Sequence, residues 1–170
     1  MSGLNYAMHQ IQNNQFIDKR LVALGKNPNA TAQIEQSELG DFAENMYPNM
    51  MAQADDPAFL LKDKIISPNG EAAYGQTVAT TRNGVTHASQ IEISRAALSS
   101  WHTLASTIGH ELNHYIYFNT GIYDSWVSKF GVIRADALDE YKAHYWEKQR
   151  GGSPSINIMN SNLRTFNTVK

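Results

Sequence analysis

The sequence predicts an α+β fold that is mostly helical and carries one small β-hairpin. Apolar residues recur at helical spacing across residues 100–119, which predicts a long helix, and a second long helix is expected at about residues 134–149. Asn83-Gly84 stands between two β-rich runs, residues 74–81 and 85–94, and Asn-Gly in that position is a strong signal for a tight hairpin turn. Because the hairpin directly precedes the first long helix in the chain, we expect the two to lie side by side.

Composition limits the classes of protein that this chain can belong to. A length of 170 residues suits a single domain, which we place at residues 1–150, followed by a polar and loop-like C-terminal tail at residues 151–170. The formal net charge is −2 and no run of basic residues occurs, which argues against nucleic acid or a membrane surface as a partner. The absence of cysteine excludes disulfides, thiol nucleophiles and cysteine-ligated zinc.

The sequence determines the type and bounds of the elements before the hairpin less clearly. Residues 4–24 have mostly helical spacing, and residues 32–54 read as a helix that Gly40 and Pro48 interrupt or kink. Residues 58–66 fit either a short helix or a buried strand, and periodicity does not distinguish the two.

The middle of the first long helix reads His110-Glu111-Leu112-Asn113-His114, an H-E-x-x-H pattern. Two histidines four residues apart share one face of a helix, where their imidazoles can hold a single Zn²⁺ while the intervening Glu111 lies beside the ion. The apolar residues of the helix form a separate stripe that faces a core, among them Leu104 and Ile108. The pattern therefore predicts the zinc helix of a hydrolase.

A catalytic zinc needs a third protein ligand, and the second long helix offers candidates. Residues 121–132 read as a connector with aromatic residues that we expect to wall a cleft. In the helix that follows, helical geometry places three carboxylates, one histidine and one small residue on a single narrow strip: Asp136, Glu140, Ala143, His144 and Glu147. The small Ala143 is expected to let the two helices approach closely.

The region from His110 to Glu147 resembles the gluzincin metallopeptidases, a zincin family. In that family a Glu on a second helix, followed by an E-x-x-A pattern, completes the zinc site, and Glu140-Tyr-Lys-Ala143 matches this pattern. The resemblance implies a zincin-like fold with Glu140 as the third ligand. Thermolysin-like members have an Asp four positions after that Glu, whereas this chain has His144, which either binds the metal or hydrogen-bonds the transition state. Asp136 is the alternative third ligand.

A metzincin site is excluded, because its longer pattern requires Gly and His where this chain has Tyr117 and Thr120.

The predicted activity is zinc-dependent hydrolysis of peptide bonds. Zinc held by His110, His114 and Glu140 lowers the pKa of its water towards about 7, and Glu111 acts as the general base. Candidates for stabilising the oxyanion are Tyr123, Tyr141, Tyr145 and His144, of which His144 is preferred because Tyr141 and Tyr145 turn away from the Glu140 strip.

Two further expectations concern the surroundings of the metal. Asp136 or Glu147 is expected to orient a ligand histidine. The strand at residues 85–94 is expected to hold a polypeptide substrate in extended form through main-chain hydrogen bonds, whereas its His87 reads as an ordinary surface residue.

The segment Gly3-Leu4-Asn5-Tyr6-Ala7 is similar to the junction that precedes toxin domains of Rhs-type polymorphic bacterial toxins. This resemblance implies an effector in interbacterial competition, with a cognate immunity protein as a partner. It also implies export by a dedicated secretion system, consistent with a start that lacks the pattern of a cleavable signal peptide. Two alternatives are a zinc hydrolase acting on a non-protein amide, such as a cell-wall peptide, and a non-catalytic zinc-binding interaction module.

Overall fold

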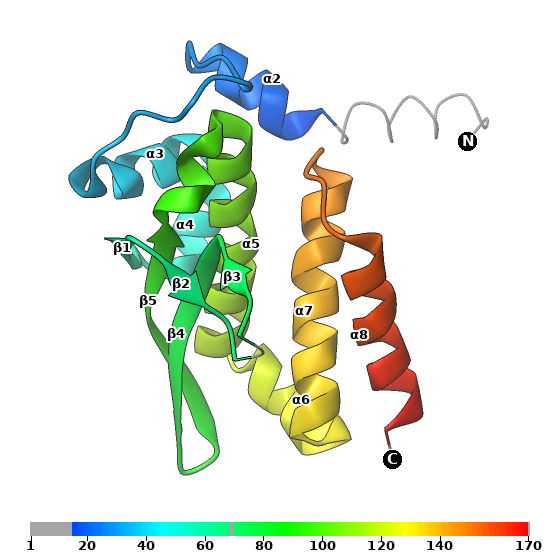
Figure 1. The fold of residues 1–170 in the computed structure, drawn as a ribbon. Coiled ribbons are helices and arrows are strands. Elements are labelled where there is room, and N and C mark those ends of the chain that lie inside the picture. Colours follow the sequence, from blue (N-terminus) through cyan, green and yellow to red (C-terminus); the bar gives the residue numbers. More distant parts are fainter. Residues whose placement is uncertain (1–14, 69, 170) are drawn as a thin grey trace, which may run out of the picture.

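A computed structural model of the chain describes residues 15–68 and 70–169 (Figure 1). The elements in chain order are α2 (Phe16–Ala23), the 3₁₀ helix η1 (Gln36–Glu38), α3 (Leu39–Met46), α4 (Pro48–Ala54), β1 (Ala58–Lys62), β2 (Ile65–Ile66), β3 (Ala72–Ala73), β4 (Gly75–Arg82), β5 (Val85–Ser94), the 3₁₀ helix η2 (Arg95–Ser99), α5 (Trp101–Asn119), α6 (Ile122–Phe130), α7 (Val132–Gln149) and α8 (Ile156–Thr168). The predicted α+β class, mostly helical with a small sheet, is confirmed. The start of the helix predicted at residues 4–24 and the toxin-like junction at residues 3–7 lie outside the described residues.

Helix α5 runs through the centre of the fold. It begins at the N-cap Ser100, whose hydroxyl accepts a hydrogen bond from the backbone N–H of Thr103. The short helices α2, α3 and α4 and the strands of the main sheet pack around it (Figure 1). The largest fully buried apolar side chains of this core are Ile17, Leu21, Leu39, Met46, Ile91, Ile93, Leu104, Ile108 and Leu112. The histidine motif is therefore carried by a helix that is buried along most of its length.

The main sheet has the strand order β1-β5-β4, with β1 parallel and β4 antiparallel to β5. The predicted hairpin is confirmed, because Asn83 and Gly84 form its turn with φ of 53° and 77°, the positive values that a tight hairpin turn requires. Residues 58–66 resolve into two strands, β1 and β2, and β2 pairs with β3 in a separate small sheet. The hairpin lies against α5, as expected from its place in the sequence.

Helix α7 lies against α5 at close range because both helices offer small residues at the contact. Ala143 of α7 is fully buried, as the sequence predicted. On α5, a Cβ atom added to Gly109 would lie 2.1 Å from Cη2 of Trp146, so a side chain larger than hydrogen does not fit there. This close approach brings the carboxylates of α7 to the histidines of α5.

Several predicted segments differ in the structure. The loop-like tail predicted at residues 151–170 is wrong, since α8 forms within it and packs along α7 (Figure 1). Helix α8 is rich in Asn and Thr, which are weak helix formers, and its one buried residue is Met159. Packing on α7 supplies the stability that local propensity does not.

The connector predicted at residues 121–132 contains helix α6, and its aromatic residues do not line the cleft described below. The helix predicted at residues 32–54 is broken at Tyr47, so that Pro48 starts α4, whereas Gly40 lies within α3 without interrupting it. Within residues 15–68 and 70–169, none of the helices has the length and apolar character needed to cross a bilayer.

Candidate metal centre

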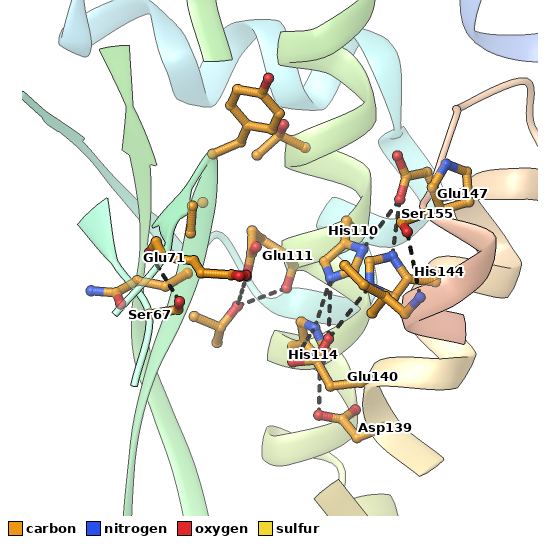
Figure 2. Close-up of a pocket in the computed structure, with 18 of the residues that line it drawn as sticks. Ser67, Glu71, His110, Glu111, His114, Asp139, Glu140, His144, Glu147 and Ser155 are labelled. Carbon is orange, nitrogen blue, oxygen red and sulfur yellow. Dashed lines mark hydrogen bonds and ion pairs between the residues drawn. The ribbon is translucent and has the colours of Figure 1, made fainter. Parts of the chain in front are cut away.

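The two motif histidines converge with a carboxylate from the second long helix, as Figure 2 shows. The Nε2 atoms of His110 and His114 lie 3.0 Å apart. Glu140 of α7 places Oε2 3.9 Å from His110 Nε2 and Oε1 3.9 Å from His114 Nε2. His110, His114 and Glu140 therefore form a group that can hold a metal ion.

The donor set and its spacing suit zinc. Bond lengths of about 2.0–2.1 Å to imidazole nitrogen and carboxylate oxygen place the ligand atoms of a tetrahedral site about 3.3 Å apart. The separations of 3.0, 3.9 and 3.9 Å lie on both sides of that value. The side chain of Glu140 is 49% exposed, so a small adjustment of this carboxylate is enough to close the site.

Asp139 orients His114, a role that the sequence analysis did not assign. Its Oδ2 lies 2.7 Å from Nδ1 of His114, and both side chains are buried. This contact leaves the Nε2 of His114 to face His110 and Glu140, as a metal ligand must. The residue was missed because it is rotated about 100° from Glu140 on the helix, outside the predicted strip. Its only signal in the sequence was a second acidic residue directly before the predicted ligand.

The electrostatics of the cluster favour positive charge. Burial by itself lowers the pKa of His114, but the carboxylates of Asp139, Glu140 and Glu111 outweigh it and raise that pKa to about 10. Burial raises the pKa of Glu140, yet the neighbouring histidines outweigh this effect and hold the pKa below its usual value. An environment that stabilises an added proton so strongly also stabilises a divalent cation at the same place.

Glu111 lies beside the two histidines but outside the ligand group. Its Oε2 accepts a hydrogen bond of 3.0 Å from the hydroxyl of Thr77 on β4, and a Cβ atom added to Gly75 would lie 2.9 Å from its Cγ. Burial raises the pKa of Glu111, while His110, His114 and Thr77 act in the opposite direction without cancelling the shift. The start of β4 therefore fixes the carboxylate in place and keeps it ready to accept a proton. Neither Thr77 nor Gly75 carried a signal in the sequence.

The alternative ligand and most of the oxyanion candidates lie elsewhere. Asp136 accepts a hydrogen bond from the hydroxyl of Tyr123 and does not join the ligand group. Tyr141 and Tyr145 stack on each other at a centroid distance of 6.0 Å and do not line the cleft. Of the four oxyanion candidates, His144 alone lines it.

Glu147 lies 3.5 Å from Nδ1 of His110, so the structure places it, and not Asp136, beside a histidine of the candidate ligand group. The same Glu147 oxygen lies 3.4 Å from Nδ1 of His144. Burial raises the pKa of Glu147, but contacts with His110, His144 and Ser106 lower it to about 2. Glu147 is therefore a carboxylate held ionised between two imidazoles.

The cluster lies in an open cleft of about 900 Å³. One wall is formed by β3, the loop before it and the start of β4, and the other by α7 together with residues 153–155 and α8. The C-terminal segment, predicted to be a loop-like tail, thus supplies part of the wall. A cleft of this size accommodates several residues of an extended chain.

The strand predicted to hold a substrate, residues 85–94, is not an edge strand. β1 pairs with its second half, and Asp124 and Asn119 occupy the same side of its first half by accepting hydrogen bonds from Thr86 and Ala88. The edge strand of this sheet next to the cleft is β4. His87 is exposed on β5, in agreement with the reading of a surface residue.

Comparison with known proteins returns no match: no family model, no curated protein and no solved structure matches this chain. The arrangement of its own residues is therefore the basis for assigning a function.

Proposed function

We propose that this chain is a zinc metallopeptidase of the gluzincin type. The main support is that His110, His114 and Glu140 converge from two helices. Glu111 lies beside them in the same cleft but outside the ligand group. An interaction module or a structural zinc site has no use for a buried carboxylate in that position. A general base is needed there for hydrolysis.

Each residue of the site has a separate role in the proposed reaction. His110, His114 and Glu140 hold the ion, which when bound lowers the pKa of water towards about 7 and polarises the carbonyl of the scissile bond. Glu111, fixed by Thr77, takes the proton of the attacking water and passes it to the leaving amine. Its raised pKa makes it a better proton acceptor than an exposed glutamate. His144, which lines the cleft, is assigned to hydrogen-bond the oxyanion.

The substrate proposed here is an extended polypeptide. Residues 75–77 of β4 line the cleft, and within the described part of the chain β4 pairs with a strand on one side only, that of β5. Its other edge offers main-chain groups that an extended peptide can pair with, irrespective of the side chains of that peptide. β4 replaces residues 85–94 in this role.

The test is a protease assay on protein of known metal content, with and without a chelator. The variant Glu111→Gln keeps the shape of the side chain but cannot take a proton, so hydrolysis is expected to fall by about 10²–10⁴-fold with the bound zinc unchanged. His114→Ala should lose both metal and hydrolysis. His87→Ala, at an exposed histidine of β5, is the matched control and should retain both. Hydrolysis of unstructured polypeptides by metal-free protein or by Glu111→Gln would refute the proposal.

The proposal extends to delivery as a bacterial toxin with an immunity protein, which rests on the resemblance at residues 3–7. Expression of the chain inside bacterial cells should then arrest growth, and Glu111→Gln should abolish the arrest. Arrest by the variant as well would separate toxicity from peptidase activity, and no arrest by either protein would contradict the toxin assignment.

A further inference from the structure

A second group of metal-ligating atoms lies directly beside the first. The rings of His110 and His144 lie next to each other with a centroid distance of 4.5 Å, one from α5 and the other from α7 (Figure 2). Their Nε2 atoms lie 3.9 and 3.8 Å from Oε2 of Glu140. Their Nδ1 atoms lie 3.5 and 3.4 Å from Oε2 of Glu147. The two imidazoles thus lie between two carboxylates.

The distances on the Glu147 side also fit a shared ion. In the metal-free protein Nδ1 of His144 and Oε2 of Glu147 form a hydrogen bond of 3.4 Å, longer than the usual separation of about 2.7–3.2 Å. Nδ1 of His110 lies 3.5 Å from the same oxygen. Ligand atoms around a tetrahedral zinc lie about 3.3 Å apart, close to the observed 3.4 and 3.5 Å. His110, His144 and Glu147 accordingly form a second group whose ligand atoms lie close enough to bind one ion.

The side chains of this group are largely buried and held in place by their neighbours. The side chains of His110, His144 and Glu147 are only 13%, 16% and 15% exposed. The second carboxylate oxygen of Glu147 accepts a hydrogen bond of 2.7 Å from the hydroxyl of Ser106, as ligating carboxylates commonly do. Gly152 covers Glu147 so closely that a Cβ atom there would lie 2.3 Å from its Cγ.

We propose that His110 Nδ1, His144 Nδ1 and Glu147 Oε2 bind a second divalent cation of the zinc type. His110 then bridges the two ions as an imidazolate, with Nε2 on the primary ion and Nδ1 on the second, and the Nδ1 proton passes to solvent. Glu147 and the imidazolate together supply negative charge that offsets the charge of the second ion.

The second ion has a consequence for His144, which rests on the proposed peptidase function. With its Nδ1 bound to the ion, a neutral His144 carries its proton on Nε2, the nitrogen that faces Glu140 and the primary group. The second ion therefore holds His144 as a hydrogen-bond donor on the side of Glu140 and the primary site.

The experiment is a titration of the full chain, stripped of metal by a chelator, with Zn²⁺ and with Co²⁺ in competition with a chromophoric chelator. Wild-type protein should bind two ions and His144→Ala one. Tyr145→Ala, at the neighbouring and exposed position of α7, is the matched control and should bind two. One ion in the wild type, or two ions in His144→Ala, would overturn the proposal.

Electron paramagnetic resonance of protein loaded with two equivalents of Cu²⁺ tests the bridge. An imidazolate between two Cu²⁺ ions couples their spins, so the wild type should lose intensity relative to His144→Ala loaded with one equivalent. Uncoupled spins in the two-copper protein would refute the bridge. These readouts need no substrate, so two bound ions without hydrolysis would refute the peptidase alone, and hydrolysis with a single ion would refute the second site alone.

Discussion

Replacing Asp139 with Asn removes a buried charge while keeping the shape of the side chain. An Asn oxygen can still accept the hydrogen bond from Nδ1 of His114, so the ring orientation is retained and the electrostatic support is lost. The contact is short, 2.7 Å, and its partners are 7% and 5% exposed, so solvent screens it little. Loss of such a partner typically weakens metal binding about 10–100-fold, or about 1.4–2.7 kcal/mol.

The assay is the Zn²⁺ dissociation constant, measured by competition with a chelator at pH 7.5. Asp136→Asn is the matched control, because Asp136 lies about one turn earlier on α7 and is bonded to Tyr123. It should change the affinity less than about threefold, which is below 0.7 kcal/mol. Melting curves of the metal-free variants show whether each protein is folded. A folded Asp139→Asn with zinc affinity within about threefold of the wild type would refute the orienting role of Asp139.

Three further predictions use other contacts. Gly75→Ala places a methyl group 2.9 Å from Cγ of Glu111, so peptide hydrolysis should fall about tenfold or more at unchanged zinc content; an unchanged rate would contradict the packing. Gly109→Ala should lower the free energy of unfolding, measured in urea, by about 1–3 kcal/mol through overpacking. Gly40→Ala, with open space around the added methyl group, should raise that free energy by about 0.5–1 kcal/mol. Equal changes in the two variants would contradict this contrast. The pKa of His114 is raised to about 10 in the metal-free fold, so its stabilising contribution is complete below about pH 6.5 and is lost as the pH rises through 10. Urea midpoints should therefore fall over that window, less so in Asp139→Asn.

The sequence was sufficient to predict what depends on local spacing. The i and i+4 positions of His110 and His114 fix their shared face once the segment is helical, and the structure bears out the helix. Glu140 lies on the predicted strip of the second helix, and its assignment as the third ligand came from the resemblance to the gluzincin metallopeptidases. The hairpin turn at Asn83-Gly84 was equally local, because it depends on two residues that tolerate positive φ.

What the sequence did not predict depends on how the elements pack in three dimensions. Which acidic residue of α7 contacts His114, Asp136 or Asp139, depends on the rotation of α7 about its axis. Gly109 and Ala143 set that rotation at the contact between α5 and α7. Thr77 reaches Glu111 only because β4 is placed against α5. Helix α8 has weak local propensity and depends on α7 for its partner surface.

The packing of α5 against α7 also connects the chemistry of the site to the stability of the fold. The proposed primary site takes two ligands from α5 and one from α7, so the unfolded chain does not present the three together. An ion that binds the folded state alone stabilises it by about 2.7 kcal/mol at one hundred times its dissociation constant. In the metal-free protein the carboxylates of Asp139, Glu140 and Glu111 stabilise the protonated form of His114, and a bound ion would take over that positive charge. The same three carboxylates therefore favour a positive charge between α5 and α7, either the proton of His114 or the proposed ion.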